Sequence, residues 1–320
     1  DKIVRRVGAL WEDFISFDNL YRAWRRAFRS TKTPEAFAFT FTVEKELFLL
    51  QEELGNYTYQ PGGYRYFTIY EPKERIISVA PFRDRVVHHA LIQILEPIFE
   101  RSFIYHSYAT RKDKGSHKVI EQAQCYLRKN RWYLKMDIAK YFDNIDHGIL
   151  NTLLAKRIKD PSILALCAKI IAQGGDGRRG LPIGNLTSQF WANVYLDPLD
   201  HYIKERLRVP AYLRYMDDFC LFSNDKSTMK NFVPVLTDFL EVSLGLHLKD
   251  RATMINTTLH GLPFLGVRIW PSLIRVGRQN LARSLGKIRQ RENEYKTRKI
   301  SHQRYRSSME SILAHIQHWN

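Results

Sequence analysis

The sequence predicts an α+β fold in which amphipathic helices surround an antiparallel sheet. Apolar residues recur every three or four positions over residues 8–55 and 84–101, which is the spacing of helices with one buried face. Strand patterns occur at RWYLKMDI (131–138) and at AYLRYMDDFCLF (211–222), where two short apolar runs flank an acidic turn and predict a β-hairpin. Because the sequence has no internal repeat and no low-complexity linker, we expect these elements to be interleaved in one unit.

The other elements follow in chain order from the same two spacings. The segment YRYFTIYEPKERIISVAP alternates and is rich in β-branched and aromatic residues, so it predicts a hairpin bent at residues 71–74. Asp84 is expected to open the next helix. The remaining predictions are a helix from near Asp146, a helix over 161–173, a long helix capped by Thr187 or Ser188 and bent or split at Pro198, a helix over 227–245 interrupted at Pro234, a strand over 264–270 and a basic helical tail from Arg275.

The composition favours a folded protein with a polyanionic partner. Hydrophobic residues make up 44% of the chain and aromatic residues 13%, which excludes a disordered protein. Lys and Arg number 50 against 33 Asp and Glu, so the formal net charge is +17. A surplus of this size favours nucleic acid as the partner, because each neutralised phosphate releases counterions. A basic protein without such a partner remains the alternative.

The cysteines and the hydropathy pattern bound the compartment. Cys125, Cys167 and Cys220 are far apart and form no CxxC pair, so we expect neither a disulfide framework nor a zinc site. A reducing compartment fits best. No apolar run reaches the ~18 residues of a membrane-spanning helix, so no membrane partner is expected.

Three aspartates stand where a strand ends or a hairpin turns. Asp137 follows the strand pattern WYLKM, and Asp217 and Asp218 lie at the tip of the predicted hairpin. Adjacent carboxylates repel each other, and a free turn would more commonly contain Asn-Gly or Asp-Gly. If the strands are neighbours, the carboxylates converge and can hold two Mg²⁺ about 3.5–4 Å apart, as in two-metal phosphoryl transfer. From the spacing alone, a solvated acidic turn and an unrelated aspartate explain the pattern equally well.

Several segments resemble the motifs of reverse transcriptases. RYMDDFCLF is similar to their YxDD box, and LKMDIAKYFDNIDH is similar to their first catalytic motif. KERIISVAPFRDRVVHHAL, SYATRKDKGSH, GLPIGNLTSQFWANVYL, LGLHLKDRATMI and GLPFLGVRIW resemble further blocks in the family's order, so the likeness covers roughly residues 60–275. The resemblance implies an α+β right-hand polymerase. Its expected regions are N-terminal helices and fingers with part of the palm (1–130), a palm (131–274) and a short, basic helical thumb (275–320).

The resemblance also implies roles for individual residues. Asp137, Asp217 and Asp218 match the catalytic, metal-binding carboxylates, and the carbonyl of Ile138 is a further metal ligand; the cofactor is two Mg²⁺ ions, with Mn²⁺ as a possible substitute. The expected nucleotide-binding residues are Lys73 and Arg75 on the triphosphate, Phe142 against the sugar, and Ile183, Gly184 and Gln189. The expected nucleic-acid-binding residues are Arg111, Ser188, Arg178, Arg179, Arg278, Lys287 and Arg291.

Two features of this set depend on local sequence. Arg178 and Arg179 lie in GGDGRRG, whose GxGxxG pattern follows a helical run and precedes LPIG, so we interpret it as a basic loop and not as a dinucleotide fold. Many reverse transcriptases carry Gln before the glycine that matches Gly184, whereas this chain has Ile183. Loss of that polar contact predicts loose base selection and resembles the enzymes of diversity-generating retroelements, which are error-prone at template adenines.

The resemblance sets the expected function and its rivals. We expect an RNA-directed DNA polymerase that uses a template RNA, a primer, the RNA–DNA duplex and deoxynucleoside triphosphates. A diversity-generating enzyme would also work with a small basic accessory protein, in the cytoplasm of a bacterial or phage-infected cell. The alternatives are a reverse transcriptase of antiphage defence and a non-catalytic, RNA-binding or maturase-like protein. The intact aspartate trio argues against the last of these.

Overall fold

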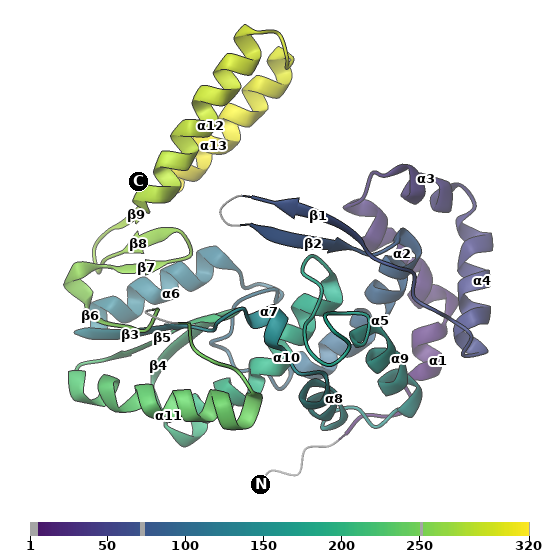
Figure 1. The fold of residues 1–320 in the computed structure, drawn as a ribbon, viewed down its shortest axis with the longest axis horizontal. Coiled ribbons are helices and arrows are strands. Elements are labelled where there is room, and N and C mark those ends of the chain that lie inside the picture. Colours follow the sequence, from purple (N-terminus) through teal and green to yellow (C-terminus); the bar gives the residue numbers. More distant parts are fainter. Residues whose placement is uncertain (1–5, 71–73, 250–251, 320) are drawn as a thin grey trace.

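A computed structural model describes residues 6–70, 74–249 and 252–319 of the chain. Figure 1 shows a helical N-terminal part on one side, a sheet with flanking helices on the other, and a pair of long helices that projects from the sheet side. The predicted α+β class is confirmed, since the structure contains both helices and sheets. The sheets are antiparallel as predicted, because all the paired strands of the described chain run in opposite directions.

The N-terminal part is helical, as the three- and four-residue apolar spacing predicts. Its main packing contact joins the second helix to the fifth, and the buried Leu20 and Ala23 of the second share one core with Val87 and Leu91 of the fifth. Thr33 caps the third helix and Pro34 opens it, since proline needs no amide partner at that position. The helices are α1 Trp11–Ile15, α2 Phe17–Arg29, α3 Pro34–Phe41, α4 Val43–Gly55 and α5 Phe82–Glu100.

A two-stranded hairpin, β1 Arg65–Ile69 and β2 Arg75–Val79, extends from these helices toward the sheet side (Figure 1). The prediction that Asp84 opens the following helix is wrong, because α5 begins two residues earlier, after Pro81. Asp84 is instead buried and accepts hydrogen bonds from the Tyr59 hydroxyl and the Gly62 amide, both at 2.7 Å. It therefore fixes the chain that leads into the hairpin.

The central sheet has the strand order β4-β5-β3-β6. Strand β3 lies between β5 and β6, and its buried residues Tyr133, Leu134 and Met136 explain why the run reads as almost continuously apolar. Helix α11 lies below the sheet and α6 lies above it in Figure 1, while α10 lies between the sheet and the N-terminal helices. The strands are β3 Trp132–Asp137, β4 Ala211–Tyr215, β5 Asp218–Ser223 and β6 Met254–Thr257.

The helices around the sheet correct three predictions. Thr187 and Ser188 do not cap the long helix, because it begins after Asn185 and both side chains are buried within it. It is not split at Pro198 but continues to His201, and α11 continues through the exposed Pro234. The helices are α6 Ser116–Lys129, α7 Tyr141–Asn144, α8 His147–Ala155, α9 Pro161–Ile171, α10 Leu186–His201, a π-helical turn Tyr202–Arg206 and α11 Lys226–Leu244.

The C-terminal part departs from the prediction of one strand over 264–270. The chain turns at Leu265 and Gly266, both in the left-handed region, and forms a three-stranded sheet of β7 Leu262–Phe264, β8 Val267–Ile269 and β9 Ile274–Val276. The basic tail is helical as predicted, although its first helix begins at Arg278. It forms a hairpin of α12 Arg278–Lys296 and α13 His302–Trp319. Within the described ranges, no helix has the length and apolar character needed to cross a membrane.

Candidate active site

The three aspartates come from two neighbouring strands. Strands β3 and β5 pair so that Asp137 lies opposite Asp218, and Asp217 is the residue before Asp218 in the turn from β4. The strand ends therefore meet, as the sequence predicts for a shared acidic site. The turn has only two residues between its strands, Met216 and Asp217, because Tyr215 already pairs with Asp218.

The backbone of this turn is strained and tied to the core. Met216 has a φ of 55°, a left-handed conformation that usually needs glycine or asparagine. Its carbonyl accepts a hydrogen bond from Nη1 of the fully buried Arg214 at 3.0 Å. Strain of this kind persists only where the surroundings hold it, and it gathers at functional sites. The acidic tip is therefore fixed by the core beneath it.

Burial makes the two hairpin aspartates costly to ionise. It raises the pKa of Asp218 to about 7; Lys135 opposes this shift, and the negative charges of Asp137 and Asp217 add to it. Burial also raises the pKa of Asp217, again with a contribution from Asp137, while Arg75 and Lys249 act in the opposite direction. The site thus concentrates negative charge in a poorly solvated place, which favours the binding of a cation.

Two lysines reach the carboxylates. Lys135 Nζ lies 3.0 Å from Asp218 Oδ2, and Lys249 Nζ lies 3.5 Å from Asp137 Oδ2. Burial works against the charged form of Lys135, but Asp218 still raises the pKa of this lysine. Within the described residues, no group of three acidic, histidine or cysteine side chains is gathered closely enough to hold a metal ion.

The donor chemistry nevertheless fits a divalent cation. Asp218 Oδ1 is buried and has no hydrogen-bond partner among the described residues, which is a costly arrangement without a ligand. Carboxylate oxygens are the ligands that Mg²⁺ prefers, and three of these groups share one sheet edge. Ile138, the expected carbonyl ligand, follows Asp137 and forms an antiparallel bridge with Leu248.

Two of the expected nucleotide-binding residues border a cavity of about 520 Å³. Arg75 and Ile183 line it, and Arg75 is exposed on β2 with an electrostatic influence on Asp217. Phe142 is half-buried on α7, and its neighbour Asp143 lines the same cavity. Lys73 lies outside the described residues. The structure thus brings Arg75, Ile183 and the short helix α7 together at this cavity.

Gly184 is needed for packing and not only for access. It has a φ of 112°, and a Cβ there would lie 2.8 Å from the Ile77 side chain and 3.1 Å from the Ser78 carbonyl. The predicted contact of Ser188 with nucleic acid does not fit the structure, because its side chain is fully buried in α10. Gln189 lines a second, smaller cavity together with Gly184. The motif that opens α10 therefore faces two cavities.

Arg111 belongs to the fold, contrary to the expectation that it contacts nucleic acid. Its guanidinium donates to both oxygens of Glu100 at 2.6–3.0 Å and to the carbonyls of Ile104 and Ser107. Its side chain is 5% exposed, so no phosphate can replace these partners without rearrangement.

The other basic candidates lie at the surface. Arg178 and Arg179 are exposed in the loop between α9 and α10, and Arg179 is 3.7 Å from Asp146. Arg278 and Lys287 are exposed on α12, whereas Arg291 pairs with Glu294 at 2.6 Å on the same helix. Figure 1 shows that α12 and α13 project away from the sheet. The GGDGRRG loop, in contrast, lies between α9 and α10. These residues do not converge on one point.

Neither lysine at the carboxylates was predicted from the sequence. Lys135 is two residues before Asp137 on one strand, and the two-residue period of a strand places both side chains on one face. That signal was present in the sequence. Lys249 had no comparable local signal, because its approach depends on the backbone bond from its amide to the Asp137 carbonyl (2.9 Å).

The family model described as "Reverse transcriptase (RNA-dependent DNA polymerase)" matches residues 70–269, more than half of the chain. Protein YkfC of Escherichia coli strain K12 is 27% identical over 288 residues, with 75% of each protein covered. The group II intron-encoded protein LtrA of Lactococcus lactis is 23% identical, over 87% of this chain and 57% of LtrA. The chain thus spans little more than half of that relative.

A solved structure of apo telomerase from Candida tropicalis has the same fold, with a TM-score of 0.53 at 13% identity over 68% of this chain and 49% of the telomerase chain. At this identity the likeness concerns the fold alone, and it shows that the helices and antiparallel sheets form a right-hand polymerase. The family match covers β2, β3 and the β4–β5 hairpin, which together carry Arg75 and the three aspartates. This chain belongs to the reverse transcriptase (RNA-dependent DNA polymerase) family.

Proposed function

We propose that this chain is an active RNA-directed DNA polymerase that makes cDNA from an RNA template by two-metal phosphoryl transfer. The observation that carries the proposal is the strand register that sets Asp137 opposite Asp218 and beside Asp217. A binding protein gains nothing from three carboxylates at one buried edge, since their mutual repulsion costs stability. The substrates would be template RNA, a primer on it and deoxynucleoside triphosphates.

The chain's own residues suit the steps of this reaction. Asp137, Asp217 and Asp218, with the Ile138 carbonyl, would hold two Mg²⁺, or Mn²⁺ in their place. When bound, these ions activate the primer 3′-hydroxyl and neutralise the leaving pyrophosphate. Arg75 presents an exposed guanidinium that can bind the triphosphate at two points. Phe142 would fill the space of a 2′-hydroxyl, and Lys135 and Lys249 would balance the carboxylate charge before the ions enter.

The regions of the molecule would divide the work of holding nucleic acid. We assign residues 1–130 to fingers with part of the palm, 131–274 to the palm and 275–320 to the thumb. Arg278 and Lys287 on α12 would contact the backbone of the RNA–DNA duplex. Arg178 and Arg179 would contact phosphate from the loop before α10, where both side chains are exposed.

Ile183 supports the finer proposal that copying is error-prone at template adenine, as in a diversity-generating retroelement. Its side chain is apolar and lines the cavity that Arg75 also lines, so it offers no hydrogen bond to a nucleotide there. A small basic accessory protein and a bacterial or phage-infected host would accompany this role. A defence reverse transcriptase would use the same chemistry, and the likeness to a group II intron-encoded protein favours binding of intron RNA as a second candidate role.

Primer extension on a defined RNA template tests the proposal. We expect cDNA with Mg²⁺ and none with EDTA, and errors gathered opposite adenine if the retroelement role is right. Asp217→Asn should abolish synthesis and leave salt-dependent RNA binding intact. Asp238→Asn, an exposed aspartate on α11, is the matched control and should synthesise normally. Equal synthesis by Asp217→Asn and wild type would refute the metal-site assignment.

A further inference from the structure

A continuous row of aromatic rings runs along one side of helix α2. Its members come from three helices, and neighbouring rings have centroids 4.8–6.3 Å apart. In spatial order they are Phe48, Phe17, Tyr21, Trp24, Phe28 and Phe37. The four rings on α2 recur every three or four residues, the spacing that aligns side chains on one face of a helix. We call these six rings the aromatic strip.

Much of the aromatic strip is open to solvent. Tyr21 is 39% exposed, and Phe37 and Phe48 are each 52% exposed. Figure 1 shows α3 and α4 at the edge of the molecule, on the side away from the sheet. Single exposed apolar side chains are ordinary in soluble proteins, but a connected apolar surface marks a site of interaction. The strip therefore suits a partner that covers it.

The α2 edge of the strip is basic. Helix α2 carries four arginines and one aspartate. Arg25 and Arg29 lie one helical turn apart, and each follows a ring of the strip by one position, so they stand on the solvent side of the rings. Both are exposed, and neither has an ion-pair partner within the described residues, whereas Arg22 pairs with Asp18 at 2.7 Å. This edge thus carries positive charge that is free to meet a partner.

The α4 edge of the strip is acidic. Helix α4 carries four glutamates and one lysine. Glu44 and Glu52 are exposed and lie four residues before and after Phe48, so all three share one side of the helix. Glu53 pairs with Arg83 at 2.5 Å, but Glu52 has no ion pair in the described part of the chain. Because Glu52 stands in the last turn of α4, where the helix dipole disfavours negative charge, a positive partner group would stabilise it.

These two edges make the surface complementary to a second copy of itself. In a two-fold dimer, each copy contributes the same surface to the interface. If the two-fold axis runs along the strip, the arginine edge of each copy meets the glutamate edge of the other. The two aromatic strips then pack against each other between two rows of paired charges, which is the apolar centre and polar rim of a specific protein interface.

Other partners match this surface less well. A nucleic acid that covered the strip would meet the arginines of α2, but the glutamates of α4 would repel its phosphates. An anionic membrane surface would meet the same repulsion. A second copy of the chain supplies an opposite charge to both edges at once and covers the exposed rings with other rings.

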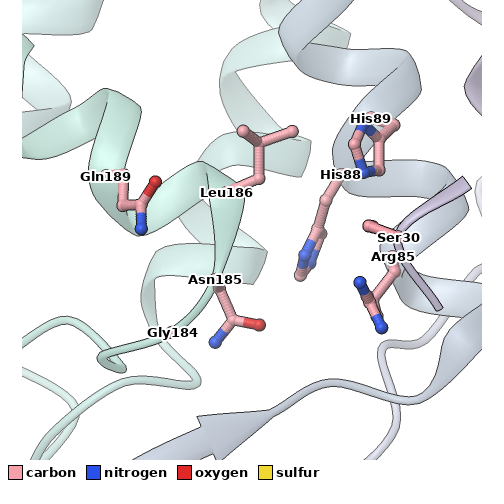
Figure 2. Close-up of a pocket in the computed structure, with 8 residues that line it drawn as sticks. All are labelled: Ser30, Arg85, His88, His89, Gly184, Asn185, Leu186 and Gln189. Atoms are coloured by element: carbon pink, nitrogen blue, oxygen red, sulfur yellow. The ribbon is translucent and has the colours of Figure 1, made fainter. Parts of the chain in front are cut away.

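We propose that the protein forms a two-fold dimer through the aromatic strip and its two charged edges. Helices α2, α3 and α4 end before residue 70, so this surface lies outside the region that the family match covers. Ser30, just after α2, lines a cavity of about 220 Å³ together with Arg85 and His88, as Figure 2 shows. None of the six rings lines that cavity or the 520 Å³ cavity beside Arg75. The inference is therefore independent of the proposed function.

Sedimentation velocity of the full chain, freed of bound nucleic acid and run over a range of protein concentrations, tests the inference. Wild type should sediment as a dimer that dissociates on dilution, and more readily at high salt because salt screens the charged edges. Phe48→Ser should raise the dissociation constant about tenfold or more, as expected for an aromatic residue at the centre of an interface. The matched control is Tyr70→Ser, because Tyr70 is 73% exposed after β1 and outside the strip, and it should leave the dissociation constant unchanged. A wild type that remains a single chain at every concentration would overturn the inference.

Charge reversal tests whether the two edges meet. Arg25→Glu combined with Arg29→Glu makes both edges acidic. Glu44→Arg combined with Glu52→Arg makes both edges basic. All four side chains are exposed, so each double variant should remain folded, which circular dichroism checks. Each double variant alone should fail to dimerise where the wild type is a dimer, whereas an equimolar mixture should form a heterodimer, because opposite charges then meet along both edges. A mixture that stays monomeric, or a double variant that dimerises alone as tightly as the wild type, would overturn the inference.

Discussion

Arg214 and Asp200 form a fully buried ion pair beneath the acidic hairpin. Arg214 Nε donates to Asp200 Oδ1 at 2.8 Å and Nη2 donates to Oδ2 at 2.6 Å, a two-point contact between β4 and α10. The Tyr212 hydroxyl donates to the same carboxylate at 2.6 Å. Since Arg214 also donates to the Met216 carbonyl, this pair connects α10 to the residue that precedes Asp217.

Breaking this pair on one side should be far more costly than breaking a surface pair. Asp200→Asn leaves the guanidinium of Arg214 buried without its counterion, which costs about 3–5 kcal/mol of the free energy of unfolding. The matched control is Asp18→Asn, which breaks the exposed Arg22–Asp18 pair (2.7 Å) and should cost about 0–1 kcal/mol. Urea denaturation measures both. Similar losses for the two variants would show that the buried pair has no special weight.

Features that depend on nearby residues could be predicted from the sequence, and features that depend on contacts between distant residues could not. Asp137 and the β4–β5 hairpin were predictable, because a strand pattern and an acidic turn are local signals. The pairing of Asp200 with Arg214 was not, since it joins residues from separate elements and only tertiary packing brings them together. The same packing carries α10 past Pro198, where helix propensity predicts a break. Leu265 and Gly266 turned one expected strand into a hairpin through left-handed backbone that no side-chain pattern reveals.

In the candidate site, too, some residues lie where the sequence predicts and others do not. Arg75 and Ile183, which the family resemblance assigns to nucleotide binding, line the same cavity. Arg111 was expected at nucleic acid because its segment resembles a motif of the family, yet its partner Glu100 lies on another element and neutralises its charge. Charge alone therefore does not separate a binding arginine from a structural one, and the counterion decides.

Without metal, the ionisation of Asp218 should lower the free energy of unfolding. Because the pKa of Asp218 in the fold is raised to about 7 from 3.8, the folded protein binds the proton more tightly than the unfolded chain. In EDTA, stability should therefore fall as pH rises from about 4 to about 7 and then level off as far as this group is concerned. Asp218→Asn removes that cost, so its melting temperature should exceed that of wild type above pH 7 by several degrees, at roughly 2–4 °C per kcal/mol.

Below about pH 4 the advantage of Asp218→Asn should vanish, because Asp218 is then protonated in both states of the wild type. Mg²⁺ at neutral pH should stabilise the wild type and not the variant, since a ligand that binds only the native state raises its stability. Differential scanning fluorimetry over this pH range checks both statements. A constant difference between the two proteins at every pH would contradict the raised pKa.

Replacement of Phe142 should change sugar selection. The ring is half-buried against Tyr141, and Phe142→Val removes its outer part while keeping a branched apolar side chain. Ribonucleotide incorporation relative to deoxynucleotide should rise about tenfold or more, the range for a change of a few carbons in an apolar pocket. Phe239→Val is the control, because Phe239 stacks on Tyr202 away from the site at 4.2 Å and should lose only stability. Single-nucleotide extension with matched dNTP and rNTP measures the ratio.

Ile183→Gln should make copying more accurate. The backbone of residue 183 is held by a hydrogen bond from the Ser78 amide to its carbonyl at 2.8 Å, so the substitution changes the side chain in the cavity and not the position of the chain. A glutamine there can donate to and accept from a bound nucleotide, and a site that pairs polar groups rejects poor fits more strongly than an apolar one. Ile183→Leu keeps the cavity apolar and should retain the wild-type error spectrum. The error rate is measured by sequencing cDNA that wild type, Ile183→Gln and Ile183→Leu each make on one RNA template. An unchanged rate of errors opposite template adenine in Ile183→Gln would show that residue 183 does not set fidelity.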